Sequence, residues 1–216
     1  MDLAPLAQTF AIYALPVLFA ITLHEAAHGF VARHFGDMTA HAQGRISLNP
    51  VRHVDPVGTI LVPAAILVAT GGRFLFGWAK PVPVNYSALR RPRQHMMWVA
   101  AAGPAANLAM AIGWALLVKL ALVLPANAFS LPMRLMGEAG VLVNLTFMFL
   151  NLLPIPPLDG GRIVASLLPA AAARRYARLE PWGLVILLVL LFTGVIGAVL
   201  RPLVDGSEAL LYVLVR

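Results

Sequence analysis

Long apolar runs separated by short polar stretches dominate the chain. Four of them meet or approach the length of about 20 residues that a helix needs to cross a bilayer. They cover residues 10–33, 96–124, 135–153 and 182–200. This pattern predicts an all-α polytopic membrane protein with about four to five transmembrane helices.

The remaining stretches add smaller features to this picture. Residues 203–216 are too short and too interrupted to predict as a confident span. The polar stretches "GRISL" (44–48) and "KPVPVNY" (80–86) are typical of short extended segments, and the prolines of the second confine it to a sheet edge or an irregular loop. No polar stretch is long enough for a separate domain, so we expect one domain over residues 1–216.

Composition supports the membrane assignment. Of the 216 residues 60% are hydrophobic and only 12% are charged, whereas soluble domains carry about 25% charged residues. The absence of cysteine excludes a disulfide scaffold and cysteine-ligated metal. The formal charge of +7 comes from basic residues between apolar runs, which the positive-inside rule explains, so we expect no nucleic-acid partner.

One apolar run contains the segment "HEAAH" at residues 24–28. His24 and His28 are four residues apart and therefore share one face of a helix, where two imidazoles can bind one Zn²⁺ ion. Glu25 projects from the adjoining turn and can act as general base on a water molecule. The alternative is a chance pattern of capping or interface residues, but unpaired polar groups are costly in an apolar helix. The segment thus predicts a metal site.

A catalytic zinc site normally has a third protein ligand. His34, His41 and His95 lie in polar or basic surroundings, which favours surface positions. Two unusual segments remain, "RHVDPVG" (52–58) and "NLLPIPPLDGGR" (151–162). In the second, three prolines must open the preceding helix, and a carboxylate follows the break at Asp159. Asp159 is the favoured third ligand, and the alternative is an ordinary solvated Pro-Asp-Gly turn.

The first of these segments contains His53 and Asp55, for which two interpretations stay open. His53 can gate access to the site or transiently occupy the open position of the metal. Alternatively, both residues cap and orient the turn into the apolar run at 58–70. A gating histidine would alter the pH dependence of the reaction, whereas a capping residue would affect stability.

Coordination constrains the membrane path. The histidines lie near the end of helix 10–33 and Asp159 follows helix 135–153, so the two helices must run in the same direction to share one ion. Residues 34–95 then make no net crossing, and the 13-residue run 58–70 should be re-entrant. With that topology one side carries twelve Lys and Arg residues against three, but the split is nine against six if 58–70 spans. The positive-inside rule favours the re-entrant form and a site near the cytoplasmic face.

Two motifs together resemble the site-2 protease family of intramembrane zinc metalloproteases. They are His24-Glu25-Ala26-Ala27-His28 and the pattern that runs from Asn151 and Pro154 to Asp159-Gly160. "AAGPAANLAMA" (101–111) is similar to another helix of that family, and "FGWAKPVPVN" (76–85) and "LNPVRHVDPVGT" (48–59) look like its compact bacterial branch. No PDZ or CBS domain is expected, and no apolar helix precedes the HEAAH helix.

The resemblance implies roles for individual residues. His24, His28 and Asp159 would bind one Zn²⁺ per chain, Glu25 would be the catalytic base, and Asn151 and Asn107 would position the substrate or the developing oxyanion. A catalytic core of about residues 10–162 would be followed by C-terminal helices at about 182–216. Substrates would be transmembrane proteins in the inner membrane of a bacterial cell, and the oligomeric state is open.

Two other classes of function are compatible with the same metal ligands. A membrane zinc transporter or zinc-binding protein would use the histidines and the aspartate but would not need Glu25. A non-catalytic scaffold of the same fold would bind helices without cleaving them. The intact Glu25 argues against both alternatives.

Overall fold

The computed structural model describes residues 4–62, 65 and 79–215, and within these residues it contains helices and coil but no strand. The α-helices are α1 (Ala4–His34), α2 (Thr39–Ala42), α4 (Pro92–Val123), α5 (Ser130–Asn151), α6 (Asp159–Leu167), α7 (Ala170–Ala177), α8 (Gly183–Phe192) and α9 (Val195–Val215). Shorter helical turns are η1 (Pro50–His53), η2 (Pro56–Leu61), η3 (Tyr86–Ala88) and η4 (Glu180–Trp182).

Three of these helices are long and apolar enough to cross a membrane. They are the stretches Ala7–His34 of α1, Pro92–Val123 of α4 and Ser130–Asn151 of α5. A fourth candidate is the bent pair Ala170–Phe192 and Val195–Val213, if the pair is counted as one span. The prediction of an all-α polytopic membrane protein is confirmed, at the lower end of the expected number of helices.

The apolar run 182–200 differs from the straight span that its hydropathy predicts. It is divided between α8 and α9, which meet at an angle of 77°. Gly194 lies at the junction with a φ of +78°, a conformation that glycine adopts without steric cost. Residues 203–215, too interrupted to predict as a span, continue α9 instead.

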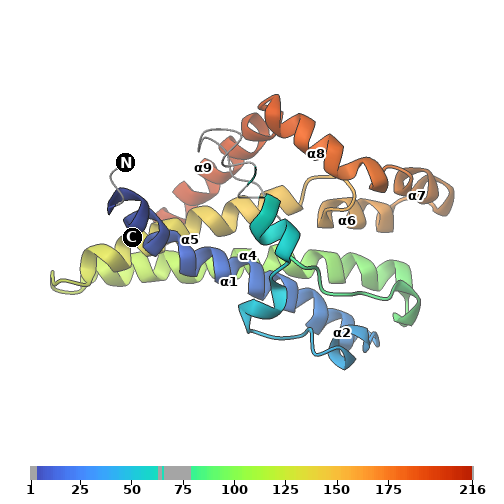
Figure 1. The fold of residues 1–216 in the computed structure, drawn as a ribbon, viewed down its shortest axis with the longest axis horizontal. Helices are drawn as coiled ribbons and strands as arrows, with labels where there is room; N and C mark the ends of the chain where they lie inside the picture. Colours follow the sequence, from blue (N-terminus) through green and yellow to red (C-terminus); the bar gives the residue numbers. More distant parts are fainter. Residues whose placement is uncertain (1–3, 63–64, 66–78, 216) are drawn as a thin grey trace.

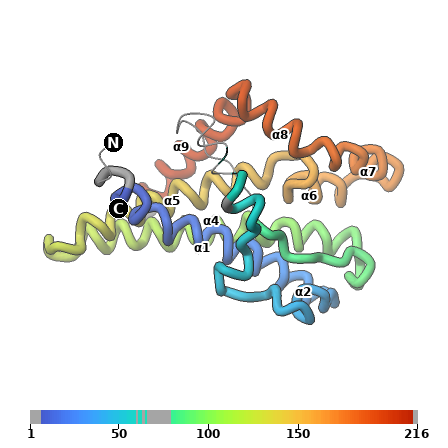
Figure 2. Tube along the Cα trace, viewed as in Figure 1, coloured from blue at the N-terminus to red at the C-terminus, as the bar shows by residue number. Residues whose placement is uncertain are grey.

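The long helices α1, α4 and α5 pack against one another and form the centre of the molecule. Figure 1 shows α1 and α5 running in the same direction, with α4 antiparallel to both, as the shared metal site requires. The tube in Figure 2 shows α6 lying beside the first part of α4 after α5 ends, while α8 and α9 turn back over α5.

Small side chains allow this close packing. The buried face of α4 repeats every four residues, through Gly103, Asn107, Ala111 and Ala115. Small residues at such a face let helix backbones approach closely in a membrane, where burial of apolar surface gives little drive for association. Ala111 and Ala115 pack with residues of α5 and α9, namely Val141, Leu145, Met148, Val204 and Leu211.

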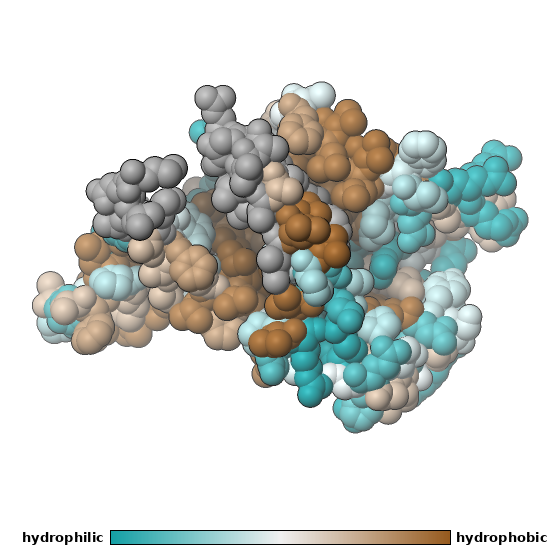
Figure 3. Space-filling model, in the orientation of Figure 1, coloured by the Kyte–Doolittle hydropathy of each residue, from teal (hydrophilic) through white to brown (hydrophobic). Residues whose placement is uncertain are grey.

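The outer surface shows where the bilayer and water meet the protein. Large apolar side chains on the long helices are exposed, such as Phe10, Leu122 and Leu131, as expected for contact with lipid. Hydrophilic residues gather at one end of the molecule, over α2 and the loop that follows it and over α7 (Figure 3).

Some sequence predictions fall partly outside the described residues. Of the run 58–70, only 58–62 and 65 are described, so its re-entrant path stays a prediction. Of the two segments expected to be extended, 44–48 begins in a turn at Gly44, which has a φ of +62°, and continues as coil, whereas 80–86 is coil as far as Asn85 and η3 begins at Tyr86. The coil of the second segment, which we call the covering segment (residues 79–85), runs past α1 and reaches Glu25.

Candidate metal centre

His24, His28 and Asp159 meet in the interior of the helix bundle. The two histidines lie on one face of α1, and Asp159 is the first residue of α6; all three are buried. The Nε2 atoms of the histidines are 3.1 Å apart. Asp159 Oδ2 lies 3.2 Å from His24 Nε2 and 3.3 Å from His28 Nε2. The structure therefore brings together the three residues that the sequence favours as metal ligands.

Groups behind the rings orient both histidines. His28 Nδ1 donates to the carbonyl oxygen of Val99 over 2.7 Å. His24 Nδ1 lies 2.6 Å from Asn107 Oδ1. Because a carbonyl oxygen only accepts hydrogen bonds, each Nδ1 carries a hydrogen, and the neutral ring presents the Nε2 lone pair to the centre.

A chain of amides fixes which way Asn107 points. Its Nδ2 donates to the carbonyl of Ala20 and to Asn144 Oδ1, at 3.2 and 3.0 Å. Asn144 Nδ2 in turn donates to the carbonyl of Gly140 over 2.8 Å. Since the chain ends on a main-chain carbonyl, Asn144 and Asn107 each have one possible orientation, and Asn107 Oδ1 must face His24. The chain thereby sets the tautomer of a metal ligand from two helices away.

The turn after α5 places Asp159. Gly160 follows it where an added Cβ would lie 2.2 Å from the carbonyl oxygen of Leu152, so the start of α6 can pack against this turn only without a side chain. Burial raises the pKa of the Asp159 carboxyl, but hydrogen bonds and positive charge from the facing rings of His24 and His28, when these rings are protonated, lower it by more. The net effect holds this pKa well below its usual range, and the carboxyl stays ionised.

Gly103 of α4 leaves the space in front of the nitrogen atoms open. An added Cβ there would lie 2.5 Å from His28 Nε2 and 2.6 Å from His24 Nε2. No other described glycine has its open face on the histidine rings. The absence of this side chain creates a cradle directly beside the ligand atoms.

The donor set fits a zinc ion. With a hydrogen on each Nδ1 atom, the two imidazole Nε2 atoms and one carboxylate oxygen face one another without a hydrogen between them. Asp159 Oδ2 is buried and has no hydrogen-bond partner in the described chain. Bonds of about 2.0–2.2 Å at tetrahedral angles separate ligand atoms by about 3.3 Å, close to the distances of 3.1–3.3 Å observed here. A cation satisfies all three acceptors at once.

Glu25 lies on the adjoining face of α1 and is half-buried. Its Oε2 accepts a hydrogen bond of 2.7 Å from the main-chain N–H of Val82, in the covering segment. Glu25 Oε1 is not used by this contact. A carboxylate held by a single N–H donor keeps acceptor capacity for the proton of a water molecule.

Arg45 attaches the covering segment next to this contact. Its guanidinium donates to the carbonyl of Lys80 over 2.9 Å, to that of Pro81 over 3.3 Å, and to that of Arg52. The main-chain N–H of Lys80 also donates to the carbonyl of His53 over 2.9 Å. These bonds fix the two residues that immediately precede Val82.

The other predicted site residues occupy different surroundings. Asn151 Nδ2 donates to the carbonyl of Phe147 in its own helix, and Asn151 is only half-buried. His53 is buried, and its Nε2 donates to the carbonyl of Ser47 over 2.9 Å. Asp55 caps η2 by accepting from the N–H groups of Val57 and Gly58. His53 is not part of the three-residue cluster, and the gating interpretation stays a prediction.

Sequence reasoning assigned no role to Gly103, Asn144 and Arg45. Asn144 did carry a signal, because an amide inside the apolar run "VLVNLTF" needs a partner in the protein interior. Gly103 lies in a segment noted for its resemblance only, and no pattern in the sequence indicates that Arg45 reaches residues 80 and 81.

The helix bundle and the buried His-His-Asp centre define a membrane protein of the metalloprotease class. Comparison with known proteins agrees: the model of peptidase family M50 matches residues 126–194, and the chain belongs to this family. A Bacillus subtilis (strain 168) protein named "Putative zinc metalloprotease YwhC" is 40% identical over 203 residues, which cover 90% of this chain and 86% of the relative.

Two further relatives carry the name "Putative zinc metalloprotease Rip2". The protein of Mycolicibacterium smegmatis is 33% identical over 82% of this chain, and that of Mycobacterium tuberculosis (strain H37Rv) is 34% identical over 80%. The chain spans 64% and 63% of their lengths. No solved structure matches the chain. The predicted family and the prediction of a protease are confirmed.

Proposed function

We propose that this protein is an intramembrane zinc metalloendopeptidase that hydrolyses peptide bonds in or near the transmembrane helices of other membrane proteins. The observation that carries the proposal is the position of the cluster of His24, His28 and Asp159, which is buried between helices long and apolar enough to cross a bilayer. Water and substrate would have to reach this centre within the protein.

The residues support a hydrolytic mechanism. His24, His28 and Asp159 would hold one zinc ion, which when bound polarises the scissile carbonyl and activates a water molecule. Glu25 would accept the proton of the attacking water and deliver it to the leaving amide nitrogen. The Val82 N–H would hold Oε2 of Glu25 while the other oxygen takes the proton.

An apolar groove offers a place for a substrate helix. It has a volume of about 440 Å³ and is lined by residues of α1, of α4 and of the turn after α1: Phe30, Val31, His34, Phe35, Trp98, Ala101, Ala102 and Ala105. Phe30 and Val31 lie two and three residues after the proposed metal ligand His28, and Ala101 and Ala102 directly precede Gly103. A substrate helix in this groove must unwind locally, and the covering segment would pair with its backbone by strand addition, although Pro81 and Pro83 limit the donors available.

Charge supports a cytoplasmic orientation in the inner membrane of a bacterial cell. Helices α1 and α5 run in one direction (Figure 1), so the loops that follow them, residues 33–95 and 154–181, leave the bundle from the same end. They carry twelve of the sixteen Lys and Arg residues. The positive-inside rule would place this end, and the site beside it, toward the cytoplasm. We further propose that residues 1–216 act as one domain.

Two variants test the function together. The protein, purified in detergent, is incubated with a panel of transmembrane helices, and bound zinc is measured in the same samples. Glu25→Gln should retain zinc and lose cleavage, because the general base is needed for the chemistry and not for coordination. Asp159→Ala should lose both. Wild-type turnover by Glu25→Gln would contradict the mechanism, and full zinc occupancy in Asp159→Ala would remove Asp159 from the ligands.

A further inference from the structure

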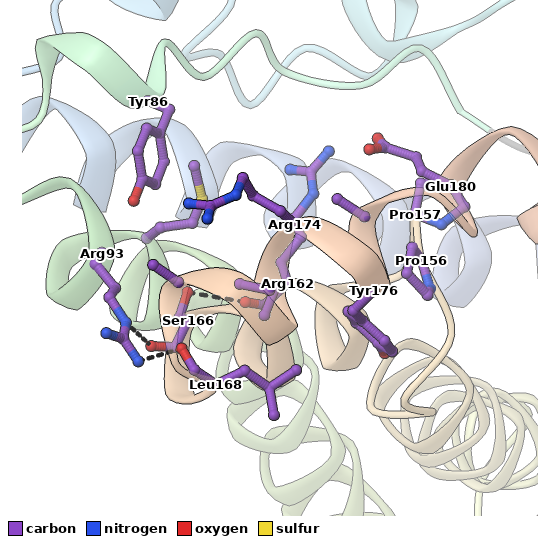
Figure 4. A pocket seen from close by; sticks show the side chains of 16 residues that line it. Tyr86, Arg93, Pro156, Pro157, Arg162, Ser166, Leu168, Arg174, Tyr176 and Glu180 are labelled. Atoms are coloured by element: carbon purple, nitrogen blue, oxygen red, sulfur yellow. Dashed lines mark hydrogen bonds between the residues drawn. The ribbon is translucent and has the colours of Figure 1, made fainter.

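A second groove lies at the polar end of the molecule, separate from the apolar groove of α1 and α4. It has a volume of about 500 Å³ and is walled by η3, the start of α4, the turn at Pro156 and Pro157, α6 and α7. Figure 4 shows Arg162 and Arg174 between Tyr86 on one side and Glu180 on the other. Most of its wall is apolar, and its charged side chains are those of Arg93, Arg162, Arg174 and Glu180.

The three arginines of this groove differ in their bonding. Arg93 is already used, because its guanidinium donates to the carbonyls of Ser166, Leu167 and Leu168 at the end of α6. Arg162 and Arg174 make no side-chain hydrogen bond or ion pair with any described residue. Arg162 is also half-buried. A half-buried cation without a partner indicates that an anion belongs beside it.

The position of the groove indicates where this anion comes from. Helix α7 carries Arg174 and Arg175, Arg178 is its C-cap residue, and the exposed indole of Trp182 lies directly before the apolar helix α8. A basic amphipathic helix followed by an exposed tryptophan is typical of the boundary between bilayer and water. Phospholipid phosphates lie at this depth, and basic grooves between helices on the cytoplasmic side bind anionic headgroups.

We infer that this groove binds the phosphate of an anionic phospholipid from the surrounding leaflet, through Arg162 and Arg174. Guanidinium groups suit this role, because their planar forks match two phosphate oxygens. The hydroxyl of Tyr86, which has no hydrogen-bond partner among the described residues, offers a further donor. The apolar wall formed by Met96, Pro156 and Leu168 accommodates the upper part of an acyl chain. Glu180 lies on the opposite side of the arginines from Tyr86 (Figure 4), so the phosphate is held on the Tyr86 side.

Occupancy of this groove bears on the metal centre. Pro156, Pro157 and Gly161 form part of its wall, and Asp159 lies between them in the chain. A bound lipid would hold the turn that presents Asp159 to the histidines. This consequence rests on the proposed function, whereas lipid binding itself does not.

The experiment measures lipid binding independently of cleavage, in the full chain carrying Glu25→Gln. The protein is placed in nanodiscs of phosphatidylcholine with or without phosphatidylglycerol, and retained lipid is identified by native mass spectrometry after release. We expect preferential retention of phosphatidylglycerol, reduced at least about tenfold in Arg162→Gln/Arg174→Gln. The matched control is Arg175→Gln/Arg178→Gln, which removes the same charge from residues that do not line the groove.

Each outcome decides the proposal. Equal loss in the control pair would overturn it in favour of general surface charge, and equal retention of both lipids would overturn it as well. Displacement of the lipid by inorganic phosphate at physiological concentration would show a site for soluble phosphate instead. If the double variant does not fold, the single variant Arg174→Gln, at an exposed position, gives the same comparison. Stimulation of cleavage by phosphatidylglycerol in the active protein then tests the link to Asp159 separately.

Discussion

Two of the metal ligands and the proposed base are neighbours on α1, yet different parts of the protein hold them. His24 and His28 are oriented by Asn107 and Val99, within the buried contact of the long helices. Glu25 is oriented by the N–H of Val82, in a coil segment at the polar end of the molecule. The ligand side therefore depends on helix packing, and the base side depends on how a segment of coil is attached.

This difference has consequences for stability and function. Helices packed closely through small residues form a rigid contact, because adding even one methyl group there disturbs the packing. Coil segments with few buried contacts open more readily than packed helices. Metal binding and peptide hydrolysis should thus be separable by mutation, although their residues are adjacent in sequence.

The ligand side should break most completely at Gly103. A Cβ in Gly103→Ala would lie 2.5 Å from His28 Nε2, in the space that a metal ion needs. We expect zinc content to fall to background and cleavage to disappear with it. Zinc analysis and the cleavage assay measure both.

The control for this variant is Gly113→Ala, on the same helix. A Cβ at Gly113 meets nothing within 4 Å. Alanine is favoured over glycine in a helix by about 1 kcal/mol, so neither variant should weaken α4 through backbone propensity. Normal zinc binding by Gly103→Ala would show that the open cradle is unnecessary.

Asn107 should have the next largest effect. Asn107→Ala removes the acceptor of His24 Nδ1 and the donor to Asn144. Loss of such an orienting partner typically lowers metal affinity about 10- to 100-fold. Competition with a zinc chelator measures this change.

Asn151→Ala sharpens the same experiment. The Asn151 amide bonds only to Phe147 of its own helix among the described residues, so zinc affinity should be unchanged. A role in positioning substrate would appear instead in KM and kcat. An equal loss of zinc affinity in both variants would contradict the different roles of the two asparagines.

The base side should respond to Arg45. Arg45→Gln removes the donors to the Lys80 and Pro81 carbonyls and should loosen Val82 over Glu25. Since misplacement of a catalytic group by about 1 Å can cost up to about 100-fold, we expect kcat to fall about tenfold with KM and zinc content unchanged. Faster hydrogen–deuterium exchange in a peptide covering residues 79–85 would accompany the fall.

Arg52→Gln is the matched control, because the Arg52 side chain donates to the Gly44 carbonyl and makes no hydrogen bond to the covering segment. It should keep the kcat of the wild type. A loss of zinc in Arg45→Gln would show that the ligand side and the base side are not separable, which would contradict their different means of support.

The same comparison explains how much of the site could be predicted from the sequence. His24 and His28 are related by local helix geometry, and the prolines before Asp159 mark a break that any helix must show. The fold class followed from hydropathy alone. Local rules also account for the bend at Gly194, although only the structure gives its angle.

The remaining features depend on contacts between distant segments. Asn144 acts on His24 only through Asn107. Arg45 bonds to residues 80 and 81, and the sequence does not show that these two distant segments lie side by side. For Asn107 the resemblance implies a role at the substrate, and the structure adds a hydrogen bond to a ligand ring. Such pairings are set by how the helices pack, which the apolar pattern does not specify.

The smallest effect on catalysis is expected at His53. Its imidazole donates to the Ser47 carbonyl, and its main-chain carbonyl accepts from Lys80, so the residue links two coil segments and its side chain makes the link to Ser47. His53→Ala would leave a carbonyl without its donor, which costs about 1–3 kcal/mol when the group is buried. We expect a lower melting temperature in detergent, with zinc content unchanged and with the pH profile of cleavage at the same position. A gating imidazole would instead gain and lose its proton in the neutral range, so its removal would change the shape of that profile. A displaced profile with unchanged stability would therefore support gating and reject the structural role, and it would extend the base side of the site to His53.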